Sequence, residues 1–378
     1  MGKVAIVNRT NLKNYGSVLQ VYALCEAVKN LGYESEVVWE QGSVSKNYDF
    51  RLQKIFMTAM KMTAHPSLIA GVVNTMKEVK AKPVAEGKAE KFDTFVSKHI
   101  TQKLYSSKML SQIAKGDEYS KFICGSDQVW CSTTMYVDPL MYLRFVPKHK
   151  RIAYAPSIGR NYIPNYNRSQ MKKYISEIPY ISIREDDGQR LVKELTGRDI
   201  PVVLDPTLLL EQNQWKQIAY SEIRTQEKYA LLYFLDETTE RNQKEIVDFL
   251  EQQHLYAYSI GQDVQMAAKS GNVQNLDCGP NDFLSLIQNA EIIITDSYHG
   301  MLFSMIFHKR FWSVERVYQQ YDQSSRQRTI LNRLDLEDRY IKDCKDISLE
   351  LVDYDFVGKI LKQLRKESIG YLKTAIEG

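Results

Sequence analysis

The chain has 378 residues, and its 50 Lys and Arg against 46 Asp and Glu give a formal net charge of +4 at pH 7. With 44% hydrophobic and 25% charged residues, the composition excludes a largely disordered, collagen-like or coiled-coil protein. The near balance of charge disfavours a general nucleic-acid binder, which usually carries a basic excess on one face.

The sequence also bears on the compartment. The longest apolar runs, such as residues 229–235, are far shorter than the roughly 20 residues that span a bilayer, and residues 1–8 start a strand without the apolar core of a signal peptide. Five cysteines are scattered without paired spacing, which argues against a disulfide framework or a zinc site. We therefore expect a cytoplasmic protein with no transmembrane segment and with reduced thiols.

The first half of the chain alternates strand and helix patterns. Apolar residues at helical spacing follow the β-rich run 4–7, and Gly32 then provides a left-handed helix end before a strand over 34–39. Further predicted elements of this half are strands over 121–124, 151–155, 180–183 and 202–204 and a helix over 187–195.

A locally basic segment covers residues 46–91, where Arg51, Lys54 and Lys61 stand among apolar residues. The favoured interpretation is one or two surface helices packed through their apolar face. The alternative is a basic helical insertion that contacts an anionic membrane peripherally, or a lipid-linked substrate.

The second half repeats the alternation. The pattern predicts strands over 229–235, 255–260, 292–295 and 311–314, helices over 241–252, 281–290 and 301–308, and a helical tail.

This order predicts an α/β fold with two Rossmann-like domains facing each other. The N-terminal domain covers 1–220, the C-terminal domain 221–340, and the helical tail 341–378. In such sheets ligands bind beyond the carboxyl ends of the strands, so we seek the chemistry in those turns and in a cleft between the domains.

The strongest local motif is Asp-Ser-Tyr-His-Gly at residues 296–300, between a strand of Ile residues and an apolar helix. Asp296 or Ser297 could cap the helix, and His299 could bind an anion or act as a general acid. The alternative is that Ser297 only caps and that His299 is a buried, hydrogen-bonded residue.

Two more turns suit a hydroxyl-rich ligand. Residues 125–130, Gly-Ser-Asp-Gln-Val-Trp, follow a strand, and Asp127 could be a base for a sugar hydroxyl or part of an Asx turn. Residues 14–17, Asn-Tyr-Gly-Ser, occupy the first strand–helix turn, where Gly16 permits close backbone approach but gives no dinucleotide motif.

Arginines supply candidate anion contacts, and no metal-ligand pattern is present. Arg184 directly follows a strand, and Arg326 and Arg328 precede a helical pattern, so each could hold a phosphate or carboxylate group. The six histidines are widely separated, and no zinc or P-loop motif occurs.

Taken together, the order of these motifs resembles the polysaccharide pyruvyl transferase family. The matching stretches are residues 14–24, 122–130, 153–159, 182–185, 204–209, 295–300 and the segment with Arg326 and Arg328. The segment 46–91 and the tail after about residue 340 carry no family motif.

The resemblance implies a fold similar to GT-B glycosyltransferases and transfer of a pyruvyl (ketal) group from phosphoenolpyruvate to a sugar. The sugar would belong to a surface glycan or its lipid-linked precursor, in cell-envelope or exopolysaccharide biosynthesis. No resident cofactor is expected, because phosphoenolpyruvate is the donor substrate. His299 would be the acid or phosphate contact and Asp127 the base. Substrate binding is assigned to Asn14, Gly16, Ser17, Ser126, Gln128, Ser157, Arg184, Asp205, Ser297, Arg326 and Arg328.

One position departs from the family pattern. Many members have an arginine where this chain has Ser297, two residues before His299. Two alternatives therefore stay open: a GT-B-type glycosyltransferase that uses a nucleotide sugar, and a non-catalytic glycan-binding protein.

Overall fold

A computed structural model describes residues 2–8, 14–42, 51–69, 86–261, 271–316 and 324–378. The chain forms two compact units. Unit 1 comprises Met1–Leu12, Cys25–Val202 and Leu372–Gly378. Unit 2 comprises Lys13–Leu24 and Val203–Tyr371, so the first and last long helices have residues in both units.

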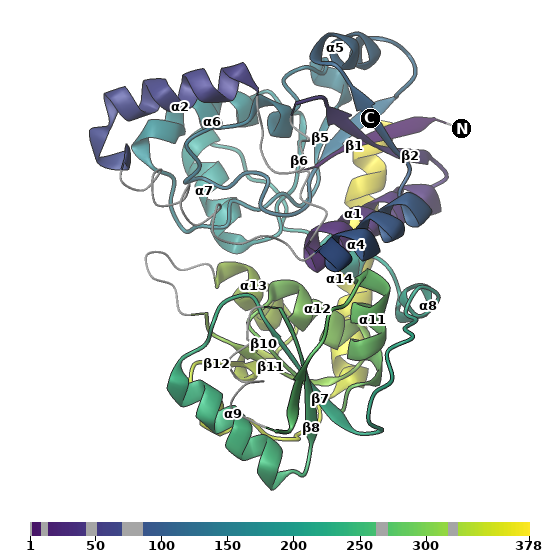
Figure 1. The fold of residues 1–378 in the computed structure, drawn as a ribbon. Helices are drawn as coiled ribbons and strands as arrows, with labels where there is room; N and C mark the ends of the chain where they lie inside the picture. The colour runs from purple at the N-terminus through teal and green to yellow at the C-terminus, as the bar shows by residue number, and fades with distance from the viewer. Residues whose placement is uncertain (1, 9–13, 43–50, 70–85, 262–270, 317–323) are drawn as a thin grey trace. The chain divides into compact units, whose positions relative to one another are not determined.

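Unit 1 is built on a parallel six-stranded sheet with the order β3-β2-β1-β4-β5-β6 (Figure 1). Its strands are β1 (Lys3–Val7), β2 (Glu34–Glu40), β3 (Gln102–Tyr105), β4 (Lys121–Cys124), β5 (Arg151–Ala153) and β6 (Tyr180–Ile181). Its helices are the C-terminal part of α1 (Tyr15–Asn30), whose larger part belongs to unit 2, α2 (Leu52–Ala64), η1 (Pro66–Leu68), α4 (Glu86–His99), α5 (Ser107–Lys115), η2 (Pro139–Tyr142), η3 (Lys148–Lys150), α6 (Asn165–Ser176) and α7 (Asp186–Thr196).

Unit 2 has a second parallel six-stranded sheet, with the order β12-β11-β10-β7-β8-β9. Its strands are β7 (Tyr229–Phe234), β8 (Tyr256–Gly261), β9 (Val273–Asn275), β10 (Ile292–Thr295), β11 (Arg310–Val314) and β12 (Tyr340–Ile341). Its helices are η4 (Pro206–Leu208), α8 (Gln212–Lys216), α9 (Glu240–Gln252), α11 (Pro280–Asn289), α12 (Tyr298–Ile306), α13 (Ser325–Arg333), η5 (Glu337–Arg339), η6 (Cys344–Asp346) and most of α14 (Tyr354–Glu377).

The two sheets share one topology. When the strands of each unit are numbered in chain order, both sheets read 3-2-1-4-5-6, the order of dinucleotide-binding Rossmann domains. The strand order reverses between β1 and β4 in unit 1 and between β7 and β10 in unit 2, and ligands of such sheets bind at these reversals. The α/β fold with two Rossmann-like domains is confirmed.

The central strands form the cores. Every residue of β4, β7 and β10 is buried, as expected for parallel strands covered by helices on both faces. The turns at their carboxyl ends therefore extend directly from these buried cores.

Three sequence predictions need correction. Of residues 202–204, predicted as a strand, only Val202 pairs, in one bridge to Ile183, because the chain turns at Asp205 and Pro206. The helix predicted from residue 301 begins at Tyr298, because Ser297 caps it. His299 therefore lies in the first helical turn.

The third correction concerns the basic segment 46–91. It contains α2 and the start of α4, but no residue of α2 is buried, so the favoured packing through an apolar face is wrong for this helix. Residues 46–50 and 70–85 lie outside the described part of the chain. Among the helices that the structure describes, none has the length and apolar character needed to cross a bilayer.

Candidate active site

The Asp-Ser-Tyr-His-Gly motif lies at the strand reversal of unit 2. The carboxylate of Asp296 accepts hydrogen bonds from the N–H groups of Leu235 (2.7 Å) and Asp236 (3.1 Å), which directly follow β7. The hydroxyl of Ser297 accepts the N–H of Gly300 at 3.3 Å and caps α12. Asp296 thus joins the ends of two adjacent strands, and the predicted capping role of Ser297 is confirmed.

Asp296 is also electrostatically unusual. Burial raises its pKa to about 6, although the Leu235 N–H and the guanidinium of Arg316 oppose this rise. The Arg316 Nε lies 3.6 Å from Asp296 Oδ2 and donates to Asp236 Oδ2 at 2.8 Å. Sequence reasoning missed Asp236 and Arg316, although both closely follow strands, the signal that pointed to the other candidates.

His299 is paired with a second predicted residue. Its imidazole is buried, and Nε2 lies 3.8 Å from Oδ2 of the buried Asp205. The other oxygen of Asp205 accepts the N–H (3.0 Å) and hydroxyl (2.8 Å) of Thr207. Within the described residues, His299 Nε2 has no hydrogen-bond partner. His299 is buried as the structural interpretation expected, but that interpretation also required a hydrogen bond, and none reaches Nε2.

The first turn of α1 lies against the same imidazole. A Cβ atom at Gly16 would fall 2.0 Å from His299 Nδ1, so only glycine fits. Tyr15 fixes this turn, because its hydroxyl donates to the carbonyl of Cys278 at 2.7 Å and its ring stacks on Phe283. Asn14 accepts the N–H of Ser17 at 3.3 Å at the start of the helix. The close approach that the sequence predicts at Gly16 is therefore made to His299.

The two C-terminal arginines differ in their surroundings. Arg326 is buried, and its guanidinium lies 5.5 Å from the centre of the Tyr298 ring, which is itself 5.1 Å from the His299 ring. Arg328 is half exposed, donates to Ser324 at 3.0 Å and lies 3.9 Å from Glu315. Arg326 is thus linked to the histidine through one ring, whereas Arg328 is engaged with other residues.

The strand reversal of unit 1 carries a buried ionic network. The Arg184 side chain is 0% exposed, and its guanidinium lies 3.4 Å from both Ser126 Oγ and Asp127 Oδ1 and 3.8 Å from Glu185 Oε2. Asn8, which follows β1, donates to the carbonyl of Gly125 at 3.2 Å. This network lies where the Rossmann topology predicts a ligand site.

Glu185 organises the neighbouring loop and was not singled out from sequence as a site residue. Its Oε1 accepts the hydroxyl of Ser157 (2.9 Å) and the N–H groups of Ile158 (2.7 Å) and Gly159 (3.1 Å). Gln128 lies against Gly159, where a Cβ would fall 2.4 Å from its amide nitrogen. The position of Glu185 directly after Arg184 was the available signal.

The predicted site residues therefore form two groups. Unit 1 brings together Ser126, Asp127, Gln128, Ser157 and Arg184. Unit 2 holds Asn14, Gly16, Ser17, Asp205, Ser297, His299, Arg326 and Arg328. Asn14 and Gly16 thus belong to the group that contains His299.

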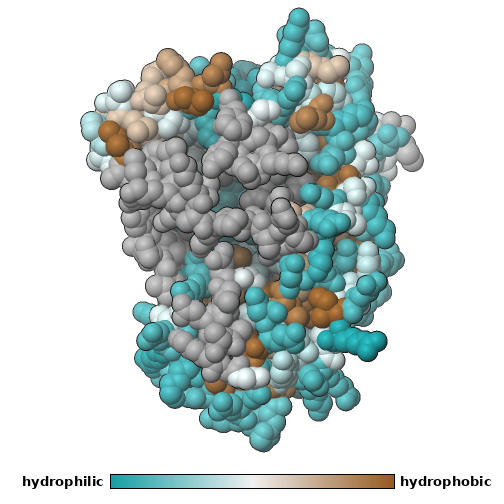
Figure 2. Space-filling model, in the orientation of Figure 1, coloured by the Kyte–Doolittle hydropathy of each residue, from teal (hydrophilic) through white to brown (hydrophobic). Residues whose placement is uncertain are grey.

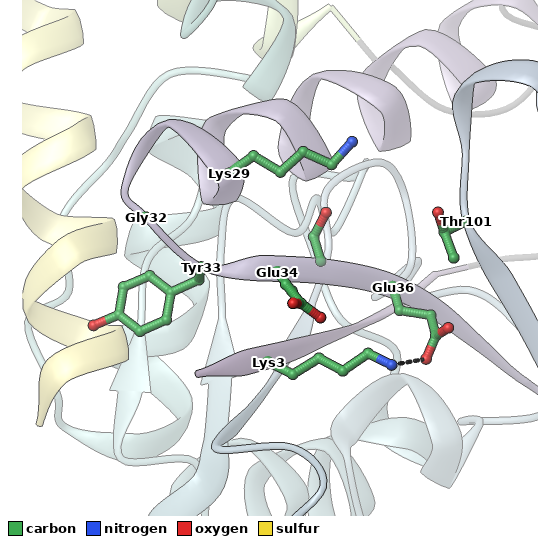
Figure 3. A pocket seen from close by; sticks show the side chains of 8 residues that line it. Lys3, Lys29, Gly32, Tyr33, Glu34, Glu36 and Thr101 are labelled. Carbon is green, nitrogen blue, oxygen red and sulfur yellow. Dashed lines mark ion pairs between the residues drawn. The ribbon is translucent and has the colours of Figure 1, made fainter. Parts of the chain in front are cut away.

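A hollow of about 340 Å³ in unit 1 lies away from these residues (Figure 3). It is lined by Lys3 and Glu34 at the amino ends of β1 and β2 and contains the 2.9 Å ion pair between Lys3 and Glu36. Substrates of parallel sheets bind at the opposite, carboxyl ends. In the described part of the chain, no three His, Cys, Asp or Glu side chains gather as a metal site would require.

Comparison with known proteins decides the family. The family model for polysaccharide pyruvyl transferase matches residues 14–316, which include every predicted site residue except Arg326 and Arg328. The chain belongs to the polysaccharide pyruvyl transferase family. As a family member the protein is a transferase, and the family implies a glycan acceptor. No curated protein matches the chain.

Two solved structures illustrate what this chain is similar to, both at low sequence identity. The UDP-GlcNAc 2-epimerase from Methanocaldococcus jannaschii is 10% identical, with a TM-score of 0.50, covering 95% of this chain and 92% of that one. MurG from Acinetobacter baumannii is 9% identical with a TM-score of 0.45, covering 100% and 99% of the two chains. The epimerase match agrees with the expected GT-B-like class of fold and shows nothing about activity.

Proposed function

We propose that the protein transfers a pyruvyl group from phosphoenolpyruvate to two hydroxyls of a sugar, forming a ketal on a surface glycan or its lipid-linked precursor in the cytoplasm. The observation that carries this proposal is the buried pair of His299 and Asp205, at the strand reversal of a chain from the pyruvyl transferase family. An imidazole and a carboxylate 3.8 Å apart are groups of the kind that general acid–base catalysis uses.

The chemistry needs one acid and one base. The acid protonates the methylene carbon of phosphoenolpyruvate, which becomes the methyl group and leaves a cation-like centre at C2. A sugar hydroxyl attacks C2 and gives its proton to the base, the bond between C2 and the phosphate oxygen breaks, and a second hydroxyl closes the ketal. Two hydroxyl protons leave the sugar, one balancing the new methyl hydrogen and one leaving with phosphate.

The residues divide these tasks by their chemistry. His299 serves as the acid or phosphate contact. The guanidinium of Arg326 provides positive charge nearby, because the Tyr298 ring lies next to both Arg326 and His299. Asp127 is the candidate base, and Arg184 holds its carboxylate in place. Ser126 and Ser157 are fully buried, and their hydroxyls bond to Arg184 and Glu185, so they position the loop around Asp127. Gln128, directly after Asp127, remains the candidate sugar contact of this group.

A donor screen tests this function. We expect the protein to release phosphate from phosphoenolpyruvate only when a suitable glycan is present, and to transfer no sugar from uridine or guanosine diphosphate sugars. Sugar transfer from a nucleotide donor without any response to phosphoenolpyruvate would establish a glycosyltransferase instead. Tight glycan binding without turnover of either donor would establish a binding protein.

A further inference from the structure

Helix α2 turns an apolar stripe outward. Leu52 is 82% exposed, Ile55 56%, Phe56 64% and Met60 51%. Ile55, Phe56 and Met60 follow Leu52 by three, four and eight residues, and this spacing places all four on one face of the helix. Figure 2 shows brown, hydrophobic atoms over this helix, at the upper left of the molecule. Single exposed apolar residues are common on protein surfaces, but four in one row form a contiguous patch, which is typical of an interaction site.

Polar contacts fix both ends of α2 on unit 1, and no residue of this helix is buried. Arg51, just before the helix, forms a two-pronged ion pair with Asp138 and donates to Glu40 at 3.0 Å. Near its other end Lys61 donates to the side-chain oxygen of Asn167 in α6. The helix is thus fixed at both ends with its apolar stripe facing away from the unit.

The surroundings of the stripe are cationic. Residues 51–69 include no Asp or Glu; their cations are Arg51, which is paired with Asp138 and Glu40, and Lys54 and Lys61. A hollow of about 410 Å³ between α2 and α6 borders the stripe, and Lys61 and Lys173 line it beside Met57 and Met60. Apolar and cationic surface therefore adjoin on one side of unit 1.

The size and charge of this surface favour a lipid bilayer over a protein as the partner that covers it. A helix of 13 residues is about 20 Å long and about 10 Å wide, so its stripe offers about 200 Å², well below the roughly 800 Å² per partner of a stable protein interface. A second copy would also bring the same lysines together. An anionic bilayer accepts a narrow apolar stripe and attracts the lysines beside it.

We propose that α2 rests on the surface of an anionic lipid bilayer, with Leu52, Ile55, Phe56 and Met60 inserted at the boundary between headgroups and acyl chains. Lys54, Lys61 and Lys173 then lie near the lipid phosphates. Because Arg51 bonds to Glu40 at the carboxyl end of β2, the helix starts at the same sheet edge that carries Asp127. If the proposed function holds, this position suits a lipid-linked acceptor.

Vesicle flotation tests the proposal without any donor or acceptor, so its outcome is independent of pyruvyl transfer. We expect the full chain to bind vesicles of phosphatidylcholine with phosphatidylglycerol at least about tenfold more strongly than phosphatidylcholine alone, and to lose the difference in high salt. The double variant Leu52→Ser/Phe56→Ser should bind at least about tenfold more weakly. Lys54→Glu should weaken binding to the anionic vesicles only.

The matched control is Leu351→Ser/Phe356→Ser, which alters two exposed apolar residues of unit 2 and should leave vesicle binding unchanged. Thermal unfolding of all variants checks that they are folded. Equal binding of both vesicle types, or undiminished binding by Leu52→Ser/Phe56→Ser, would overturn the proposal. A dimer in solution that this variant abolishes, without vesicle binding by the original chain, would show that a second copy covers α2.

Discussion

The two sheets have one strand order but carry different chemistry at their reversals. In unit 1 the guanidinium of Arg184 is enclosed by Ser126, Asp127 and Glu185. In unit 2 the buried imidazole of His299 faces Asp205 at 3.8 Å, and no described residue hydrogen-bonds its Nε2. The topology thus determines where side chains converge, and the turn residues determine whether an ionic network around an arginine or a buried pair of histidine and aspartate results.

The largest effect on stability is expected in unit 1. Arg184→Met would leave the carboxylates of Asp127 and Glu185 without their buried cation and should lower the free energy of unfolding by about 3–5 kcal/mol. Arg190→Met is the matched control, because Arg190 forms exposed ion pairs and should cost less than about 1 kcal/mol. Urea denaturation measures both, and equal losses would contradict the enclosed network.

In unit 2 the buried Asp296 should make stability depend on pH. Its pKa in the folded chain is about 6, against about 3.9 when unfolded, so the folded state binds the proton more tightly. Its contribution is complete below about pH 4 and is lost as pH rises through 6, amounting to about 3 kcal/mol.

The variant Asp296→Asn isolates this dependence from that of other groups. Between pH 4 and pH 7 the free energy of unfolding of the original chain should fall relative to that of the variant. Parallel pH profiles of the two proteins in chemical denaturation would show that Asp296 does not titrate as described.

Gly16→Ala tests the contact that places α1 against the histidine. The new methyl group would overlap Nδ1 of His299, and a shift of about 1 Å should lower kcat/KM by about 100-fold. Gly358→Ala is the control, because that glycine in α14 has open space around it and should gain up to about 1 kcal/mol of stability with unchanged turnover. Unchanged turnover by Gly16→Ala would show that the contact between α1 and His299 is not needed for catalysis.

The smallest effect is expected at the cap of α12. Ser297→Ala removes the acceptor of the Gly300 N–H and should lower the free energy of unfolding by about 1 kcal/mol, whereas Ser297→Thr should retain most of it. Thermal unfolding of the two variants measures the difference. If the Ser297→Ala variant unfolds at the same temperature as the original chain, the capping hydrogen bond contributes nothing to stability.

Much of this architecture was predictable from periodicity and turn residues. The central strands were found because they are short, mostly apolar runs, and β10 was predicted with its observed bounds. Edge strands were missed where they lack that signal: three of the four residues of β3 are exposed, and β12 has only two residues. The outward stripe of α2 was also missed, because periodicity identifies an apolar face without showing which way it points.

The site was predictable residue by residue but not as a geometry. His299 and Gly16 were singled out from their turns and Asp205 through the family resemblance, yet nothing local to those turns shows that the three residues meet. Their contact depends on how the start of α1 joins unit 2, a long-range property of the fold.

The most direct test of the account is phosphate release from phosphoenolpyruvate by His299→Asn in the presence of a glycan that the original chain pyruvylates. Loss of the general acid should lower turnover by about 100- to 10,000-fold while the variant stays folded. Undiminished turnover would contradict the role assigned to the pair of His299 and Asp205.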